Sequence, residues 1–147
     1  MKPARNGNKI MLVDDEPDIV MTFKAALESA GFTLDAYQNP LIALSKFKPR
    51  HYDLVILDIK MSKMNGFELY AEMQKIDEHV RACFITAGEM YYDKVRQESK
   101  RGRGIDEEQY CKLDTERFIQ KPISNTDLIK RVEKIMMLSK SPNIVNA

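Results

Sequence analysis

The sequence has no tryptophan and only two cysteines, Cys83 and Cys111, among its 147 residues. The two cysteines form neither a disulfide framework nor a Cys-x-x-Cys pair, which suits the reducing cytoplasm where we expect the protein to reside. No apolar run approaches the roughly 20 residues that a membrane-spanning helix needs. The first eight residues lack the apolar segment of a signal peptide. These absences argue against a disulfide-rich secreted domain and against a membrane partner.

The sequence also lacks any imbalance of charge. Its 23 lysines and arginines face 22 aspartates and glutamates, which gives a net charge of +1. Nothing in this balance steers the whole chain toward nucleic acid or acidic membranes. The basic stretch 100–104 is followed closely by the acidic stretch 106–108, which is typical of a solvated, self-compensating loop. We therefore do not expect nucleic-acid binding.

Length and composition indicate one globular domain. A chain of 147 residues with 44% hydrophobic and 31% charged residues is typical of an ordinary soluble fold. We expect the domain to span residues 9–138, between a flexible N-terminal tail, 1–8, and a C-terminal tail, 139–147. Because the second tail is too short for an effector domain, we expect a stand-alone module.

Short apolar segments alternate with segments whose apolar residues recur at helical spacing. The segments expected to form strands are 9–13, 33–37, 54–57, 82–86 and 118–120, and those expected to form helices are 17–31, 41–47, 67–76 and 124–138. Alternating strands and helices imply right-handed βαβ crossovers. The sequence therefore predicts an α/β fold with a five-stranded parallel sheet, doubly wound by helices into a three-layer sandwich.

The segment between the fourth and fifth strands is longer than this alternation requires. Thr86 and Lys121 are 35 positions apart, whereas a helix of about a dozen residues, two loops and a short strand need only roughly 20–28. We expect the surplus around residues 101–115. It would form a flexible, highly charged loop or an extended or broken fourth helix.

Five polar residues follow the expected strands: Asp14, Asp15, Asp58, Thr86 and Lys121. The carboxyl ends of parallel strands meet at one edge of the sheet, where ligands bind in open α/β folds. Three carboxylates gathered there repel one another and require a cation, and oxygen ligands of this kind suit Mg²⁺. The charges of Mg²⁺ and Lys121 would balance the three acids.

This combination indicates phosphoryl transfer onto a carboxylate. Asp58 would act as the nucleophile and become an acyl phosphate, with Mg²⁺ offsetting the developing charge. Lys121 would contact one phosphoryl oxygen as a point charge, and the hydroxyl of Thr86 would donate to another. The added negative charge would then draw Thr86 and its loop inward, which is a switch mechanism.

The same residues resemble, in order along the chain, the motifs of the receiver domain of two-component response regulators. The matching motifs are Asp14-Asp15, Asp58 with Met61, Asn65-Gly66-Phe67-Glu68-Leu69, Thr86-Ala87 and Lys121-Pro122-Ile123. The resemblance covers residues 9–138 and implies a doubly wound, flavodoxin-like (βα)5 fold. Receiver domains are signalling modules that catalyse only their own phosphoryl transfer and dephosphorylation.

The resemblance also implies roles for individual residues. Asp58 would accept a phosphoryl group from a histidine kinase or phosphotransfer protein. Asp15, Asp58 and the backbone carbonyl of Lys60 would bind Mg²⁺ directly, and Asp14 would act through water. Thr86 and Lys121 would contact the phosphoryl group, and the Lys121–Pro122 peptide would be cis. Phe118 would be the switch aromatic, together with Thr86.

Two residues depart from the receiver pattern. Ser62 stands where receivers usually have proline, which would leave the loop after Asp58 less constrained. Phe118 replaces the frequent tyrosine and offers no hydroxyl to a partner. The enlarged segment 87–117 alters the face by which receivers usually signal, formed by the helix after Thr86, the strand 118–120 and the last helix. We expect a downstream protein to bind this face and the segment 87–117, or a homodimer to form there.

Two other functions use the same residues. A covalent-aspartate phosphohydrolase commonly needs a second acid two residues after its nucleophile, and this position is Lys60. A scaffold that no longer uses phosphate is disfavoured by the intact set of acids. The favoured interpretation is a phosphorylation-dependent signalling switch.

Overall fold

The computed structural model describes residues 8–86 and 118–138. The expectations for the two tails and for the enlarged segment 87–117 concern residues outside these ranges, apart from Asn8. Within the described ranges lie five strands: β1 (Lys9–Val13), β2 (Thr33–Tyr37), β3 (Leu54–Asp58), β4 (Ala82–Thr86) and β5 (Phe118–Gln120). The described helices are α1 (Pro17–Ser29), α2 (Pro40–Lys46), α3 (Gly66–Ile76) and α6 (Asn125–Leu138). None of these helices is both long and apolar enough to cross a bilayer.

The strands form one parallel sheet in the order β2-β1-β3-β4-β5. The predicted five-stranded, doubly wound sheet is therefore confirmed. The chain moves outward in one direction from β1 to β2 and in the other from β1 through β3 to β5, so the order reverses between β1 and β3. In open α/β sheets this switch point leaves a crevice at the carboxyl ends of the strands, where ligands bind.

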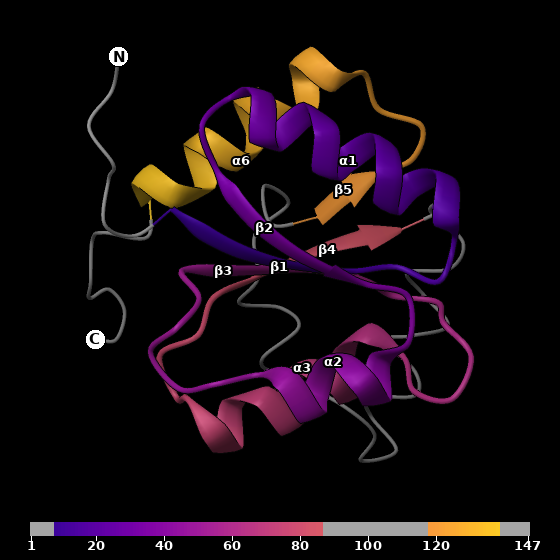
Figure 1. Ribbon diagram of the computed structural model, residues 1–147, viewed down its shortest axis with the longest axis vertical. Helices are drawn as coiled ribbons and strands as arrows, with labels where there is room; N and C mark the ends of the chain where they lie inside the picture. Colours follow the sequence, from indigo (N-terminus) through magenta and orange to yellow (C-terminus); the bar gives the residue numbers. More distant parts are fainter. Residues whose placement is uncertain (1–7, 87–117, 139–147) are drawn as a thin grey trace.

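Helices cover both faces of the sheet, with α1 and α6 on one face and α2 and α3 on the other (Figure 1). Strand alternation divides the core accordingly. Along β3, Leu54 and Ile56 pack toward α1 and α6, whereas Val55 and Leu57 pack toward α2 and α3. All five residues of β3 are buried, which explains why the strand is a continuous apolar run that ends in an acid.

Local signals begin and end the helices where the sequence suggests. Pro17 begins α1, where its missing N–H costs nothing, and Gly31 turns the chain toward β2 with a φ of 101°. The side chain of Asn39 accepts from the N–H of Leu41 at the start of α2. Asn65 and Glu68 form a reciprocal capping box at the start of α3. This cap fixes the chain seven residues after Asp58 and thereby limits the loop that borders the acid.

Candidate functional site

Asp58 ends β3, whose five residues are all buried, and lies at the carboxyl edge of the sheet. Its exposed fraction is only 4%. The N–H of Ile59 donates to the carbonyl of Ile85 at 2.9 Å, so the loop that follows Asp58 is hydrogen-bonded to β4. The neighbouring amide of Lys60 reaches Oδ1 of Asp58 only at 3.4 Å. Asp58 is thus a buried carboxylate with little hydrogen bonding of its own, fixed by rigid backbone on both sides.

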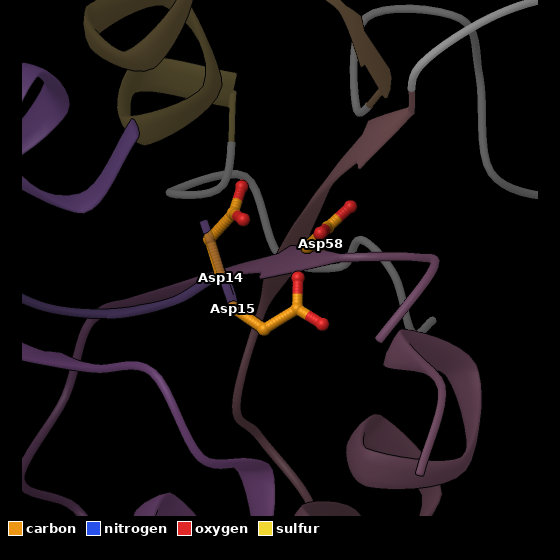
Figure 2. A group of neighbouring side chains, drawn as sticks. All are labelled: Asp14, Asp15 and Asp58. Carbon is orange, nitrogen blue, oxygen red and sulfur yellow. The ribbon is translucent and has the colours of Figure 1, made fainter. Parts of the chain in front are cut away.

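Asp14 and Asp15 follow β1, which is the strand beside β3. Figure 2 shows the three acids grouped at the ends of these two strands. Carboxylate oxygens of all three lie within 4.8 Å of one another. Asp14 is fully buried, and its Oδ1 accepts from the N–H of Glu16 at 2.9 Å. Asp15 lies closer to solvent, so the group has one open side.

Lys121 brings the compensating charge from the loop after β5. Its Nζ lies 3.2 Å from Oδ2 of Asp14 and 3.9 Å from Oδ2 of Asp58. A third acid, Glu16 at the start of α1, is nearest, with 3.0 Å between its Oε1 and Nζ. The Lys121–Pro122 peptide is cis. The structure therefore brings Lys121 to the acids, but its closest partner is a residue that the sequence did not single out.

Burial shapes the electrostatics of these groups. Burial, together with the negative charge of Asp14, raises the pKa of Asp58 to about 8, against the opposing effect of Lys121. Burial likewise raises the pKa of Asp14 above its ordinary value. Burial by itself would lower the pKa of Lys121, but the charge of Asp58 and the hydrogen bond to Glu16 leave that pKa raised. The ammonium of Lys121 therefore does not fully offset the effect of burial on the two carboxylates.

The donor set fits a divalent cation. Among the described residues, Oδ2 of Asp14 is a buried side-chain oxygen with no hydrogen-bond partner, although the ammonium of Lys121 is nearby. A buried polar atom left without a hydrogen bond is costly. An ion with oxygen ligands at about 2.0–2.6 Å can join oxygens that are roughly 4–5 Å apart. Oxygens of Asp14, Asp15 and Asp58, all within 4.8 Å of one another, satisfy this requirement, and a cation among them would offset their mutual repulsion.

The loop from Ile59 to Gly66 is closed tightly against Asp58. The N–H of Gly66 donates to the carbonyl of Ile59 at 2.9 Å. A Cβ atom at position 66 would lie 2.5 Å from the backbone oxygen of Asp58, closer than side chains are tolerated. Glycine is therefore required here for a close approach of two backbones. Gly66 supports the position of Asp58 without providing any side chain.

The two expected switch residues are placed differently. Phe118 is 7% exposed and points into the core. Its ring stacks on the ring of Phe84 at a centroid distance of 5.6 Å and makes a T-shaped contact with the ring of Phe67 at 6.3 Å. Thr86 ends β4 and pairs with Gln120 of β5, so its backbone reaches the carboxyl edge of the sheet. The side chain of Thr86 is not among those described, and its contact with a phosphoryl group stays a prediction.

The sequence predicts that Asp14, Asp15, Asp58 and Lys121 lie at the carboxyl edge of the sheet, and the structure places them there. The direct role of the Lys60 carbonyl stays untested. The sequence interpretation did not single out Glu16. The available signal was an acid directly after Asp14-Asp15, and such an acid does not indicate a partner 105 residues away.

Comparisons with known proteins agree with this geometry. The sequence model of the response regulator receiver domain family matches residues 10–133. A Haemophilus influenzae protein described as a CpxR homolog and transcriptional regulatory protein is 32% identical over 136 residues, which cover 92% of this chain and 53% of the relative. The chain spans about half the length of this relative and of a Bacteroides fragilis transcriptional regulatory protein, 53% and 49% respectively.

Solved structures show the same fold. The response regulator TrrA from Thermotoga maritima, in complex with Mg²⁺ and BeF, is 28% identical with a TM-score of 0.65, covering 87% of this chain and 98% of that one. A CheY-like receiver domain protein from Methanospirillum hungatei superimposes with a TM-score of 0.70 at 21% identity, covering 92% and 98% of the two chains. The second likeness is one of fold alone.

Proposed function

This chain belongs to the response regulator receiver domain family, and we propose that it is a phosphorylation-dependent switch whose acceptor is Asp58. Receiver domains take a phosphoryl group from histidine kinases and act on downstream partners, and they bind Mg²⁺ at an acidic pocket. The observation that carries the proposal is the buried carboxylate of Asp58, grouped with two further acids within 4.8 Å and with an ammonium 3.9 Å away.

The proposed reaction requires Asp58 in its ionised form. One carboxylate oxygen forms a new P–O bond while the P–N bond of a phosphohistidine breaks, and the released imidazole takes up a proton. Asp58 thereby becomes an acyl phosphate. When bound, Mg²⁺ supplies charge neutralisation and orients the phosphoryl oxygens. Asp15, Asp58 and the backbone carbonyl of Lys60 would hold the ion directly, and Asp14 would act through water.

Lys121 has a second role in this proposal. It lies on the same side of Asp58 as Asp14, and its ammonium reaches both acids in the unphosphorylated chain. A phosphoryl group on Asp58 would add about one negative charge at this point. Lys121 would then shift toward the phosphoryl oxygens, and the hydroxyl of Thr86 would donate to another of them. The signal would leave through the face formed by β5 and α6, near Phe118.

The downstream partner and the location belong to the same proposal. We expect a separate protein to read the face of β5 and α6 together with the segment 87–117, or a second copy of the chain to bind there. A histidine kinase or phosphotransfer protein of the cytoplasm would supply the phosphoryl group. Nothing described here favours the phosphohydrolase or the scaffold over this switch.

Incubation of the full chain with a small phosphodonor and Mg²⁺, followed by intact mass measurement, tests the proposal. We expect one phosphoryl adduct in the wild type and none in Asp58→Asn. Absence of an adduct in the wild type at any Mg²⁺ concentration would favour the phosphorylation-independent scaffold. Continuous phosphate release from many organic phosphates would favour the hydrolase.

A further inference from the structure

The loop between β3 and α3 reaches Asp15 through a backbone amide. The N–H of Ser62 donates to Oδ2 of Asp15 at 3.3 Å. Ser62 occupies the position at which the receiver pattern leads us to expect proline, and proline has no N–H to donate. We expected serine in place of proline to leave the loop less constrained. Instead, the N–H of Ser62 makes a hydrogen bond that a proline at this position could not make.

The position of this amide is set by the loop itself. On either side of Ser62, the side chains of Met61 and Met64 pack against the core between the sheet and α2 and α3. The N–H of Met64 donates back to the carbonyl of Ser62 at 2.8 Å, around Lys63 with a φ of 75°. This three-residue turn fixes the backbone on the C-terminal side of the donor. The packing of Met61 and this turn therefore restrict the backbone on both sides of the Ser62 amide.

Asp15 needs such a fixed partner more than the other two acids do. Asp14 is fully buried and bonded to the amide of Glu16, and Asp58 lies within a buried strand. Asp15 lies on a loop closer to solvent, where its side chain has more freedom to rotate. An ionised carboxylate accepts several hydrogen bonds, so one amide donor leaves capacity for a cation. Figure 2 shows one oxygen of Asp15 pointing toward Asp58 and the other pointing away.

We propose that Ser62 is a positioning residue whose backbone N–H orients Asp15 for a divalent cation. The inference rests on the proposed function, since it assigns the three acids as the cation site. Hydrogen-bond partners of metal ligands commonly change metal affinity by about 10–100-fold when removed. Because this bond is 3.3 Å long and near solvent, we expect an effect at or below the lower end of that range.

The variants Ser62→Pro and Ser62→Ala separate the amide from the side chain. Proline removes the N–H and places a ring methylene where the proton was, whereas alanine keeps the N–H and removes only the hydroxyl. Mn²⁺ affinity is measured by electron paramagnetic resonance on the full chain, and Mg²⁺ affinity by displacement of Mn²⁺. We expect Ser62→Pro to raise both dissociation constants about three- to tenfold, and Ser62→Ala to match the wild type. An unchanged affinity in Ser62→Pro would overturn the inference.

A second measurement does not depend on the folding of the proline variant. Solvent exchange of the Ser62 amide is followed by nuclear magnetic resonance in the wild type and in Asp15→Ala. We expect faster exchange in Asp15→Ala, and retained protection in the wild type when Mg²⁺ is saturating. Equal exchange in the two proteins, or loss of protection on adding Mg²⁺, would show that the amide does not orient a bound ligand.

These outcomes are distinct from failure of the proposed function. If the wild type binds Mn²⁺ and forms the Asp58 adduct while Ser62→Pro behaves identically, only the role of Ser62 is refuted. If the wild type neither binds Mn²⁺ nor forms the adduct, the proposed function itself fails.

Discussion

Lys121 and Glu16 form an ion pair beside the buried acids, with 3.0 Å between Nζ and Oε1. The same ammonium lies farther from Asp58, at 3.9 Å. Glu16 therefore competes with Asp58 for the ammonium of Lys121. In the phosphorylated state that we propose, Lys121 would have to leave Glu16 for the phosphoryl group.

Removing the charge of Glu16 should favour the phosphorylated state. Exposed ion pairs contribute about 0.2–1 kcal/mol, which corresponds to at most about a fivefold change in an equilibrium constant. We expect Glu16→Gln to bind the phosphoryl analogue beryllium fluoride, with Mg²⁺, up to about fivefold more tightly than the wild type. The measurement is a calorimetric titration.

Asp18→Asn is the matched control for Glu16→Gln. Asp18 is an exposed acid in the first turn of the same helix, so its removal changes the net charge equally. We expect this variant to bind beryllium fluoride like the wild type. Equal tightening in both variants would assign the effect to net charge rather than to release of Lys121.

The raised pKa of Asp58 predicts how stability depends on pH without divalent cations. Burial and the charge of Asp14 raise this pKa from 3.8 to about 8. Between these two values the folded chain keeps a proton that the unfolded chain releases. The contribution of Asp58 to the free energy of unfolding is therefore complete below about pH 4 and is lost as the pH rises through about 8. We expect the free energy of unfolding in EDTA to fall between pH 5 and 8, by at most about 1.4 kcal/mol per pH unit from this group.

Urea unfolding of the wild type and Asp58→Asn at several pH values measures this effect. The amide of asparagine does not titrate, so the slope should be shallower in Asp58→Asn, which should also be the more stable protein near pH 8. Exposed Asp18→Asn should keep the slope of the wild type. Parallel slopes in the wild type and Asp58→Asn would mean that Asp58 is ionised throughout this range.

Gly66 should be sensitive to the smallest possible side chain. A Cβ atom would lie 2.5 Å from the backbone oxygen of Asp58, so one of the two backbones must move. We expect Gly66→Ala to lower the free energy of unfolding by about 1–3 kcal/mol and to slow formation of the Asp58 adduct. Thermal unfolding and the rate of adduct formation by mass spectrometry measure the two effects.

Gly31→Ala controls for the loss of a glycine as such. Gly31 has a φ of 101°, but no atom lies within 4 Å of an added Cβ. Its replacement should strain the local backbone and lower stability, while the adduct forms at the rate of the wild type. If Gly66→Ala formed the adduct as fast as the wild type, phosphorylation of Asp58 would tolerate the displacement of the backbone.

Phe118 should contribute strongly to stability. Its ring is 7% exposed and contacts Phe84 and Phe67, and burial of such a ring against other aromatic rings is worth several kcal/mol. We expect Phe118→Ala to lower the free energy of unfolding by about 3–5 kcal/mol, as measured by urea unfolding. Met137→Ala, at a side chain of α6 that is 75% exposed, should change it by less than about 0.5 kcal/mol.

Much of the fold followed from the sequence because short apolar runs and helical spacing are local signals. The expected strand 54–57 and the observed Leu54–Asp58 differ by one residue, as do the expected helix 41–47 and the observed Pro40–Lys46 at each end. The buried side of α6 carries Leu128, Val132 and Ile135, which recur at helical spacing. Parallel topology then brought Asp14, Asp58 and Lys121 to one edge without any knowledge of distances.

The parts that the sequence could not provide depend on the placement of loops and side chains. The pairing of Glu16 with Lys121 joins residues 105 positions apart, and a lone acid at a helix start has many other uses. The amide of Ser62 carries no sequence signal except that the residue is not proline. The role of Gly66 follows from a distance between two backbones, which composition and spacing do not contain.

Reductive trapping identifies the residue that carries the phosphoryl group. Borohydride reduces an acyl phosphate of aspartate to homoserine, and peptide sequencing by mass spectrometry then locates the altered residue. After treatment with a small phosphodonor and Mg²⁺, we expect homoserine at position 58 and unmodified aspartate at positions 14 and 15. Homoserine at position 14 or 15, or at none of the three in a chain that has bound Mg²⁺, would contradict the assignment of Asp58 as the phosphoryl acceptor.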